Sequence, residues 1–122
     1  MNTLAELNAL LSPVLPVETG VFSGKAPDEY LVITPLADTF PVHADNAPLY
    51  EAQETRLSLF SKGNYLRRKN EITRLLLAAE FTITARLYVG YEPDTGYHHY
   101  AIDCGKCYFV TPTYFYVEGE TE

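Results

Sequence analysis

The chain has 122 residues, of which 47% are hydrophobic and 20% are charged, and its formal net charge is −7. This size fits a single domain over residues 1–122, with enough apolar material for one core and no need for a metal or a disulfide. The acidic charge argues against gripping a nucleic-acid backbone, and no run of about 18 apolar residues exists to cross a membrane. The first residues lack the pattern of a secretory signal, so we expect a soluble protein made in the cytoplasm.

The first element in chain order is a short helix. Thr3 and Glu6 have the spacing of a capping box, and leucines follow at helical spacing, which predicts a helix over residues 3–11. Pro13 ends this helix because proline lacks the N–H that a helix needs. Residues 18–20 then favour a turn.

Two strands are predicted in the next third of the chain. Residues 29–34 are rich in Tyr, Val and Ile, which favours a strand that ends at Pro35. Residues 36–49 mix prolines with Asp and Asn, a composition that suits either a long connection or an irregular strand pair. Residues 51–60 alternate between two faces and predict a half-buried strand.

The remaining patterns are the clearest in the chain. Asn64 precedes a helix over residues 65–80, whose apolar side chains repeat at spacings of three, four and seven. Apolar and polar residues alternate over 81–89, which predicts a strand with one buried face. The last predicted elements are a turn at residues 93–96, a returning strand at 97–103, a strand at 108–117 and a frayed acidic tail at 117–122.

These elements together predict an α+β fold, in which a small mixed or antiparallel sheet packs against two helices. The chain also has ten Tyr and six Phe, many of them in the last third. Tyrosine buries apolar area while keeping a polar tip, so it is common at interfaces between proteins. We therefore expect a homo-oligomer, with pairing of sheet edges as one route between copies.

Cys104-Gly105-Lys106-Cys107 is the sharpest local motif, because a C-x-x-C pair can cycle between dithiol and disulfide. The residues after it have strand composition, however, and no helix dipole would stabilise a thiolate there. His98, His99, Cys104 and Cys107 are numerically sufficient to bind zinc, but adjacent histidines on a strand point to opposite faces. We favour two cysteines that close a turn between strands, with no metal or cofactor, and keep thiol redox chemistry or zinc binding as the alternative.

The sequence contains no nucleophile elbow, zinc-protease motif or phosphate-binding loop. His43 is isolated from the other two histidines. Asp94 and Asp103 could pair for acid–base chemistry, but Asp94 lies in Pro-Asp-Thr-Gly, where aspartate is first of all a turn former. We therefore expect a protein that is not an enzyme.

Three stretches carry a resemblance to a known family. They are ADNAPLYE at residues 44–51, LSLFSKGN at 57–64 and YEPDTGYHHY at 91–100, with the predicted helix between the last two. This pattern resembles the small tail-completion (tail terminator) and head–tail joining proteins of long-tailed phages and prophages. The resemblance covers roughly half of the chain, and its motifs are structural.

The resemblance implies a non-enzymatic structural protein that forms a ring, typically a hexamer, at the head-proximal end of the tail tube. Its partners would be its own copies, the tail tube protein and the head connector proteins, with DNA only as passing cargo and no membrane. Such a protein is assembled in the cytoplasm of the host bacterium and is located in the virion at the head–tail junction. An acidic lumen would let the duplex slide. A head-closure or other connector role is the alternative, and neither role requires the cysteine pair.

Overall fold

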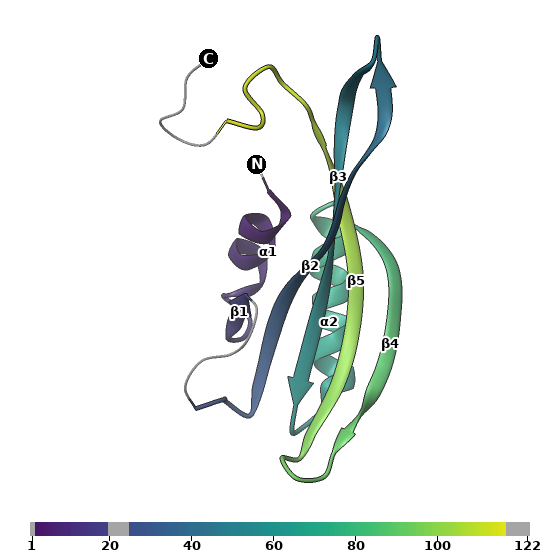
Figure 1. Ribbon diagram of the computed structural model, residues 1–122. Helices are drawn as coiled ribbons and strands as arrows, with labels where there is room; N and C mark the ends of the chain where they lie inside the picture. Colours follow the sequence, from purple (N-terminus) through teal and green to yellow (C-terminus); the bar gives the residue numbers. More distant parts are fainter. Residues whose placement is uncertain (1, 20–24, 117–122) are drawn as a thin grey trace.

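Five strands form one mixed sheet in the computed structural model, which describes residues 2–19 and 25–116 (Figure 1). The strand order is β1-β2-β3-β5-β4, in which β1 runs parallel to β2 and every other pair is antiparallel. The strands are β1 (Val17–Thr19), β2 (Glu29–Ala44), β3 (Ala47–Ser61), β4 (Thr82–Glu92) and β5 (Tyr97–Phe109), and the helices are α1 (Thr3–Leu11) and α2 (Tyr65–Ala78). The expected α+β fold with a mixed sheet and two helices is confirmed.

Both helices cover the same face of the sheet. Leu57 on β3 pairs with Ile33 on β2 and with Ile102 on β5, and the side chains of paired residues point to the same face. That face packs against the apolar stripes of α1 and α2 to form the core. The fully buried members of this core are Leu7, Leu11, Leu31, Ile33, Leu57, Leu59, Ile72, Leu76 and Ile102. In the described part of the chain the opposite face of the sheet carries no helix, and we call it the helix-free face.

The sheet is longer than the helices that cover it. Strands β2 and β3 have 16 and 15 residues, which corresponds to about 50 Å of extended chain. Helix α2 has 14 residues and therefore spans about 21 Å. The far ends of β2 and β3 consequently extend beyond both helices as a two-stranded hairpin (Figure 1). We call this hairpin, residues 36–50, the arm.

The strand predicted to end at Pro35 instead runs through two prolines to Ala44, so that prediction is wrong. Among the described strands, β1 pairs with Leu31–Ile33 of β2, so the rest of β2 is an edge of the sheet. Proline is tolerated on an edge strand because its missing N–H need not cost a hydrogen bond between strands. The register shifts after Pro35 and around Pro41 accommodate the two rings. Asp45 and Asn46 then have φ values of 52° and 63°, the left-handed conformation of a tight hairpin turn. Residues 36–49 are thus an irregular strand pair.

The single buried face predicted for residues 81–89 is wrong because β4 contains a bulge. Ile83 pairs with Cys104 on the helix-covered face, whereas Ala85 pairs with Asp103, whose side chain points the opposite way. Thr84 is therefore an extra residue that reverses the alternation. Beyond it, Leu87 lies on the helix-free face and is 44% exposed.

The helix at the start of the chain has the predicted bounds but a different cap. The side chain of Asn2, rather than that of Thr3, accepts a hydrogen bond from the backbone N–H of Ala5 at 2.7 Å. The predicted capping box is therefore wrong. Glu6 instead accepts a hydrogen bond from the hydroxyl of Tyr108, which ties the helix to the end of β5.

Three other predictions differ from the structure. Residues 17–19 form β1 where a turn at 18–20 was expected, and residue 20 lies outside the described residues. Helix α2 ends at Ala78, before the expected residue 80. The last predicted strand, 108–117, is limited to its first two residues, because β5 ends at Phe109 and turns follow around Pro112. Residues 117–122, the predicted acidic tail, also lie outside the described residues.

Within residues 2–19 and 25–116, neither helix has the length and apolar character needed to cross a bilayer. The hairpin turn predicted at residues 93–96 is confirmed, with Gly96 at a φ of 81° and its N–H donating to the carbonyl of Glu92 at 2.7 Å.

Replacing Asn2 by alanine should lower the free energy of unfolding by about 1 kcal/mol, because one N–H at the start of α1 loses its acceptor. The matched control is Asn8→Ala, on the exposed surface of the same helix, which should change the free energy of unfolding by less than about 0.5 kcal/mol. Urea unfolding followed by circular dichroism measures both, and equal losses in the two variants would contradict the capping role of Asn2.

Candidate assembly surfaces

The two cysteines lie within β5 and not in a turn between strands, so the predicted turn is wrong. They are three residues apart on a strand with unbroken register, and they therefore point to opposite faces. Cys104 is buried on the helix-covered face, where desolvation, aided by the nearby charge of Asp103, raises the pKa of its thiol to about 12. Cys107 is exposed on the helix-free face. A thiol with so high a pKa is a poor nucleophile, and the pair is not placed to form a disulfide.

The adjacent histidines also point to opposite faces. Nδ1 of His98 lies 2.9 Å from the hydroxyl of Tyr88 on the helix-covered side, whereas the ring of His99 stacks on Phe60 with 4.3 Å between centroids. Burial lowers the pKa of His99. In the part of the chain that the structure describes, no three His, Cys, Asp or Glu side chains come together in a way that could hold a metal ion.

The remaining candidates for chemistry are also apart. Asp103 forms a bidentate ion pair with Arg56, at 2.7 and 2.9 Å, on the helix-free face. Asp94 is exposed in the turn between β4 and β5, and His43 is exposed in the arm. Asp94 and Asp103 are therefore not paired for acid–base chemistry, and His43 lies apart from both.

A hollow of about 350 Å³ lies between α1 and the residues that follow α2, and its lining is mostly apolar, with Leu10, Ala79 and Phe81 among its members. Its two charged residues, Glu6 and Lys106, form an ion pair with each other at 3.4 Å. The ammonium group of Lys106 also donates to the carbonyl of Ala79 at 3.0 Å. The charges of this hollow are thus already satisfied within the chain.

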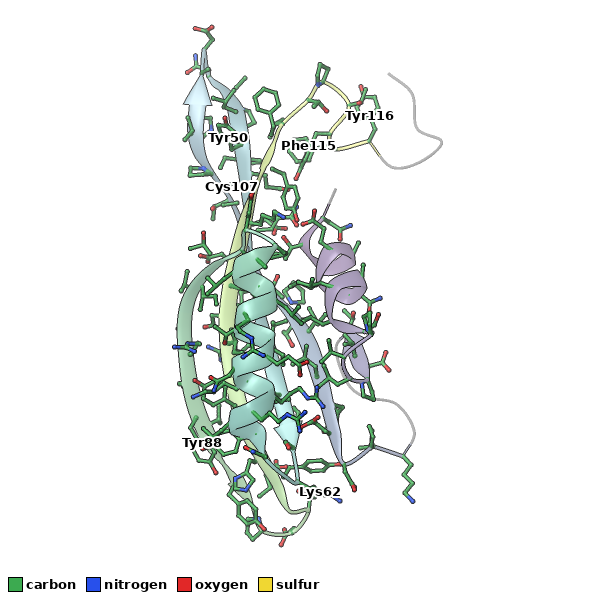
Figure 2. The ribbon with its side chains drawn as sticks, turned by 180° about the vertical axis from the view of Figure 1, so that it is seen from behind. Tyr50, Lys62, Tyr88, Cys107, Phe115 and Tyr116 are labelled. Carbon is green, nitrogen blue, oxygen red and sulfur yellow. The ribbon has the colours of Figure 1, made fainter. Side chains whose placement is uncertain are left out.

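The arm exposes an unusual amount of apolar surface. Val42 pairs with Tyr50 on β3, and Tyr50 pairs with Phe109 on β5, so these three side chains form one row on the helix-free face. They are 44%, 37% and 57% exposed. On the other side of the arm, Phe40 packs edge-on against Phe115, and both rings remain about half exposed. Figure 2 shows Tyr50 and Phe115 at the end of the molecule that no helix covers.

A hydrogen-bond network fixes the root of the arm. One carboxylate oxygen of Glu51 accepts from Gln53 at 2.8 Å and from the hydroxyl of Tyr114 at 2.7 Å. Tyr108 on β5, which pairs with Glu51 across the sheet, donates a hydrogen bond to the side chain of Glu6 on α1. The network therefore joins the base of the arm to the first helix and to the segment after β5. The sequence does not reveal this network, because Glu6 and Tyr108, the partners of one of its bonds, lie 102 residues apart.

A second exposed surface lies where α2 meets β4, and we call it the α2–β4 face. On α2 it consists of Leu66, Arg74 and Leu77, which are exposed and whose spacing places them on one side of the helix. On β4 it consists of Arg86 and Tyr88, which pair with Ile102 and Tyr100 and so point to the helix-covered side of the sheet. A hydrogen bond of 3.5 Å from Arg86 to Thr73 of α2 joins the two elements, and the three apolar members are 43–58% exposed. This surface thus combines apolar side chains with two arginines.

Neither a scan against models of known protein families nor a search of curated proteins finds a match to this sequence. The exposed surfaces described above therefore carry the functional inference.

In a Cys107→Ser variant, Cys104 should not react with iodoacetamide until the chain unfolds, because burial keeps its thiol protonated and out of contact with the reagent. Mass spectrometry should find no adduct in buffer and one adduct in denaturant. Alkylation at equal rates under both conditions would contradict the buried position of Cys104, as would a disulfide between the two cysteines after mild oxidation of the parent chain.

The stability of the fold should decrease as the pH rises above about 10. Burial and the hydrogen bond to Glu6 raise the pKa of Tyr108, and burial with the contact to Glu51 raises the pKa of Tyr114 to about 12. Below the ordinary tyrosine pKa both hydroxyls are protonated in the folded and in the unfolded chain, and their full contribution to the stability of the fold is present. Above it the unfolded chain loses protons that the folded chain keeps, so unfolding becomes more favourable. Urea unfolding at pH about 9 and at pH about 11 measures this effect. Between these two pH values the free energy of unfolding should decrease less in the double variant Tyr108→Phe, Tyr114→Phe than in the parent chain. An unchanged decrease would contradict this assignment.

Proposed function

We propose that this chain is a non-enzymatic structural subunit that assembles with its own copies into a ring, in the manner of the tail-completion proteins of long-tailed phages. The observation that carries the proposal is the arm, which extends from the domain with its apolar side chains exposed on both sides. Contiguous apolar surface of this kind is typical of sites where proteins associate.

The arm is suited to contact another chain because its conformation is fixed while its apolar side chains remain exposed. A two-stranded hairpin alone is marginally stable in water. Here the hairpin continues two strands of the main sheet, and the hydrogen bonds of Glu51 with Gln53 and Tyr114 hold its root. Its apolar side chains are therefore presented in fixed positions, and association with a partner would remove them from water.

The stretches that resemble tail-completion proteins lie at the two ends of the sheet. Residues 44–51 form the tip of the arm and the start of β3, whereas 57–64 and 91–100 lie at the opposite end, around the β4–β5 turn (Figure 1). A ring subunit meets one neighbour with one surface and the next neighbour with a different one. The net charge of −7 is compatible with a ring around passing DNA, because it disfavours binding of phosphates.

A head-closure or other connector role would use the same kind of ring and differs in the partner that the ring binds. Thiol redox or zinc chemistry gains no support, because Cys104 and Cys107 point to opposite faces and so do His98 and His99.

Purified protein should form a closed multimer, observable as a multiple of the chain mass in native mass spectrometry and as rings in negative-stain electron microscopy. The ring should bind tail tube subunits in pull-down and cap the tubes in micrographs. Binding to head connector proteins without binding to tubes would favour the connector role. A chain that stays monomeric both alone and with tail tube subunits would overturn the proposal.

A further inference from the structure

We infer that the arm of one copy docks on the α2–β4 face of the next copy. This inference rests on the proposed ring and assigns the two surfaces that join its subunits. Both surfaces expose apolar side chains in the single chain, the arm together with two aspartates and the α2–β4 face together with two arginines.

The arm cannot reach the α2–β4 face of its own chain. Tyr50 on the arm and Tyr88 on β4 lie at opposite ends of the molecule (Figure 2). The arm also continues β2 and β3, whose pairing runs from Glu29–Ser61 to Ala44–Ala47 with register shifts after Pro35 and around Pro41 but with no loop between the arm and the rest of the sheet. Contact between these surfaces is therefore a contact between different copies.

The two surfaces match in apolar character. One side of the arm offers the ring of Phe40 with that of Phe115 packed against it, and these rings are 42% and 54% exposed. The α2–β4 face offers Leu66, Leu77 and Tyr88, which are 43–58% exposed. Aromatic and aliphatic side chains at the centre of a patch supply most of the energy of a typical interface.

The two surfaces are also complementary in charge. Residues 36–50 contain Asp38 and Asp45 and no Lys or Arg. The opposing surface contains Arg74 and Arg86, and among the described residues neither of these arginines nor either aspartate is part of an ion pair within the chain. Opposite charges at an interface fix its orientation and exclude wrong pairings.

Docking by side chains fits these edges better than addition of one strand to another. The free edge of β2 contains Pro35 just before the arm and Pro41 within it, neither of which has an N–H to donate, and the register shifts at both. The free edge of β4 has register shifts at Thr84 and Val89. Interrupted edges of this kind are poor templates for pairing.

Because the two surfaces are different, the contact is heterologous, and each copy uses its arm on one side and its α2–β4 face on the other. Repetition of such a contact generates a ring when the rotation between copies closes. A single type of contact thereby accounts for both of the exposed surfaces.

Two charge variants test this contact. The arm variant is Asp38→Lys with Asp45→Asn, where asparagine tolerates the left-handed turn. The face variant is Arg74→Glu with Arg86→Glu. The control, Glu18→Lys with Asp28→Asn, makes the same change in charge as the arm variant on the β1 side of the molecule and places no lysine beside Lys62, which contacts Asp28 at 3.8 Å. Circular dichroism should show that all three variants fold.

Each test variant alone should need about tenfold higher protein concentration than the parent chain to assemble in sedimentation velocity, or more, whereas the control should assemble like the parent. A mixture of the two test variants should assemble at the parent concentration, because the Lys-bearing arm meets the Glu-bearing face and the native arm meets the native face. Parent-like assembly of each variant alone, or no recovery in the mixture, would overturn the inference while leaving the ring intact. A monomeric parent chain would instead overturn the proposed ring.

Discussion

The difference in length between strands and helices is the constraint on which the rest of this structure depends. A strand advances about 3.3 Å per residue and a helix about 1.5 Å. The 14 residues of α2 are therefore too short to cover the full length of the 15-residue strand β3. The buried core, from Leu7 to Ile102, forms under the helices. Among residues 2–19 and 25–116, no helix lies over the remaining hairpin, where Phe40 packs against Phe115 of the segment after β5.

The exposed arm is stabilised at its root and disfavours aggregation along its edge. Glu51 and Tyr108 link the base of the arm to elements at both ends of the chain, so the hairpin is held although no core supports it. Prolines at positions 35 and 41 interrupt the free edge of β2, which limits unspecific strand pairing. The apolar side chains of the arm are therefore exposed on a hairpin whose edge resists unspecific pairing. This combination suits a specific contact with a partner, which is the physical reason for proposing assembly as the function.

The sequence predicted elements whose signals are local and missed features that depend on pairing. Helix α2 was recognisable because Asn64 caps it and its apolar residues repeat at helical spacing. The bulge at Thr84 was not, because it exists only in the register between β4 and β5. From the sequence, Pro35 indicates the end of a strand. The strand continues because β2 is an edge strand at this position, which only the topology of the sheet reveals. For the candidate site, alternation along a strand already separated His98 from His99, but placing Cys104 and Cys107 on opposite faces required knowing that β5 continues through them.

Cross-linking between defined positions tests the central claim, that the arm of one copy contacts the α2–β4 face of another. In a Cys107→Ser chain, Phe40→Cys and Leu77→Cys introduce one thiol on each surface, and a short bismaleimide joins thiols that lie close together. The double variant should give a ladder of cross-linked species on a denaturing gel, ending at the ring size, while either single variant should remain uncross-linked. A dimer from Phe40→Cys alone would show that two arms meet each other, and the absence of a ladder from assembled double variant would show that the arm binds elsewhere. Either result would contradict this account.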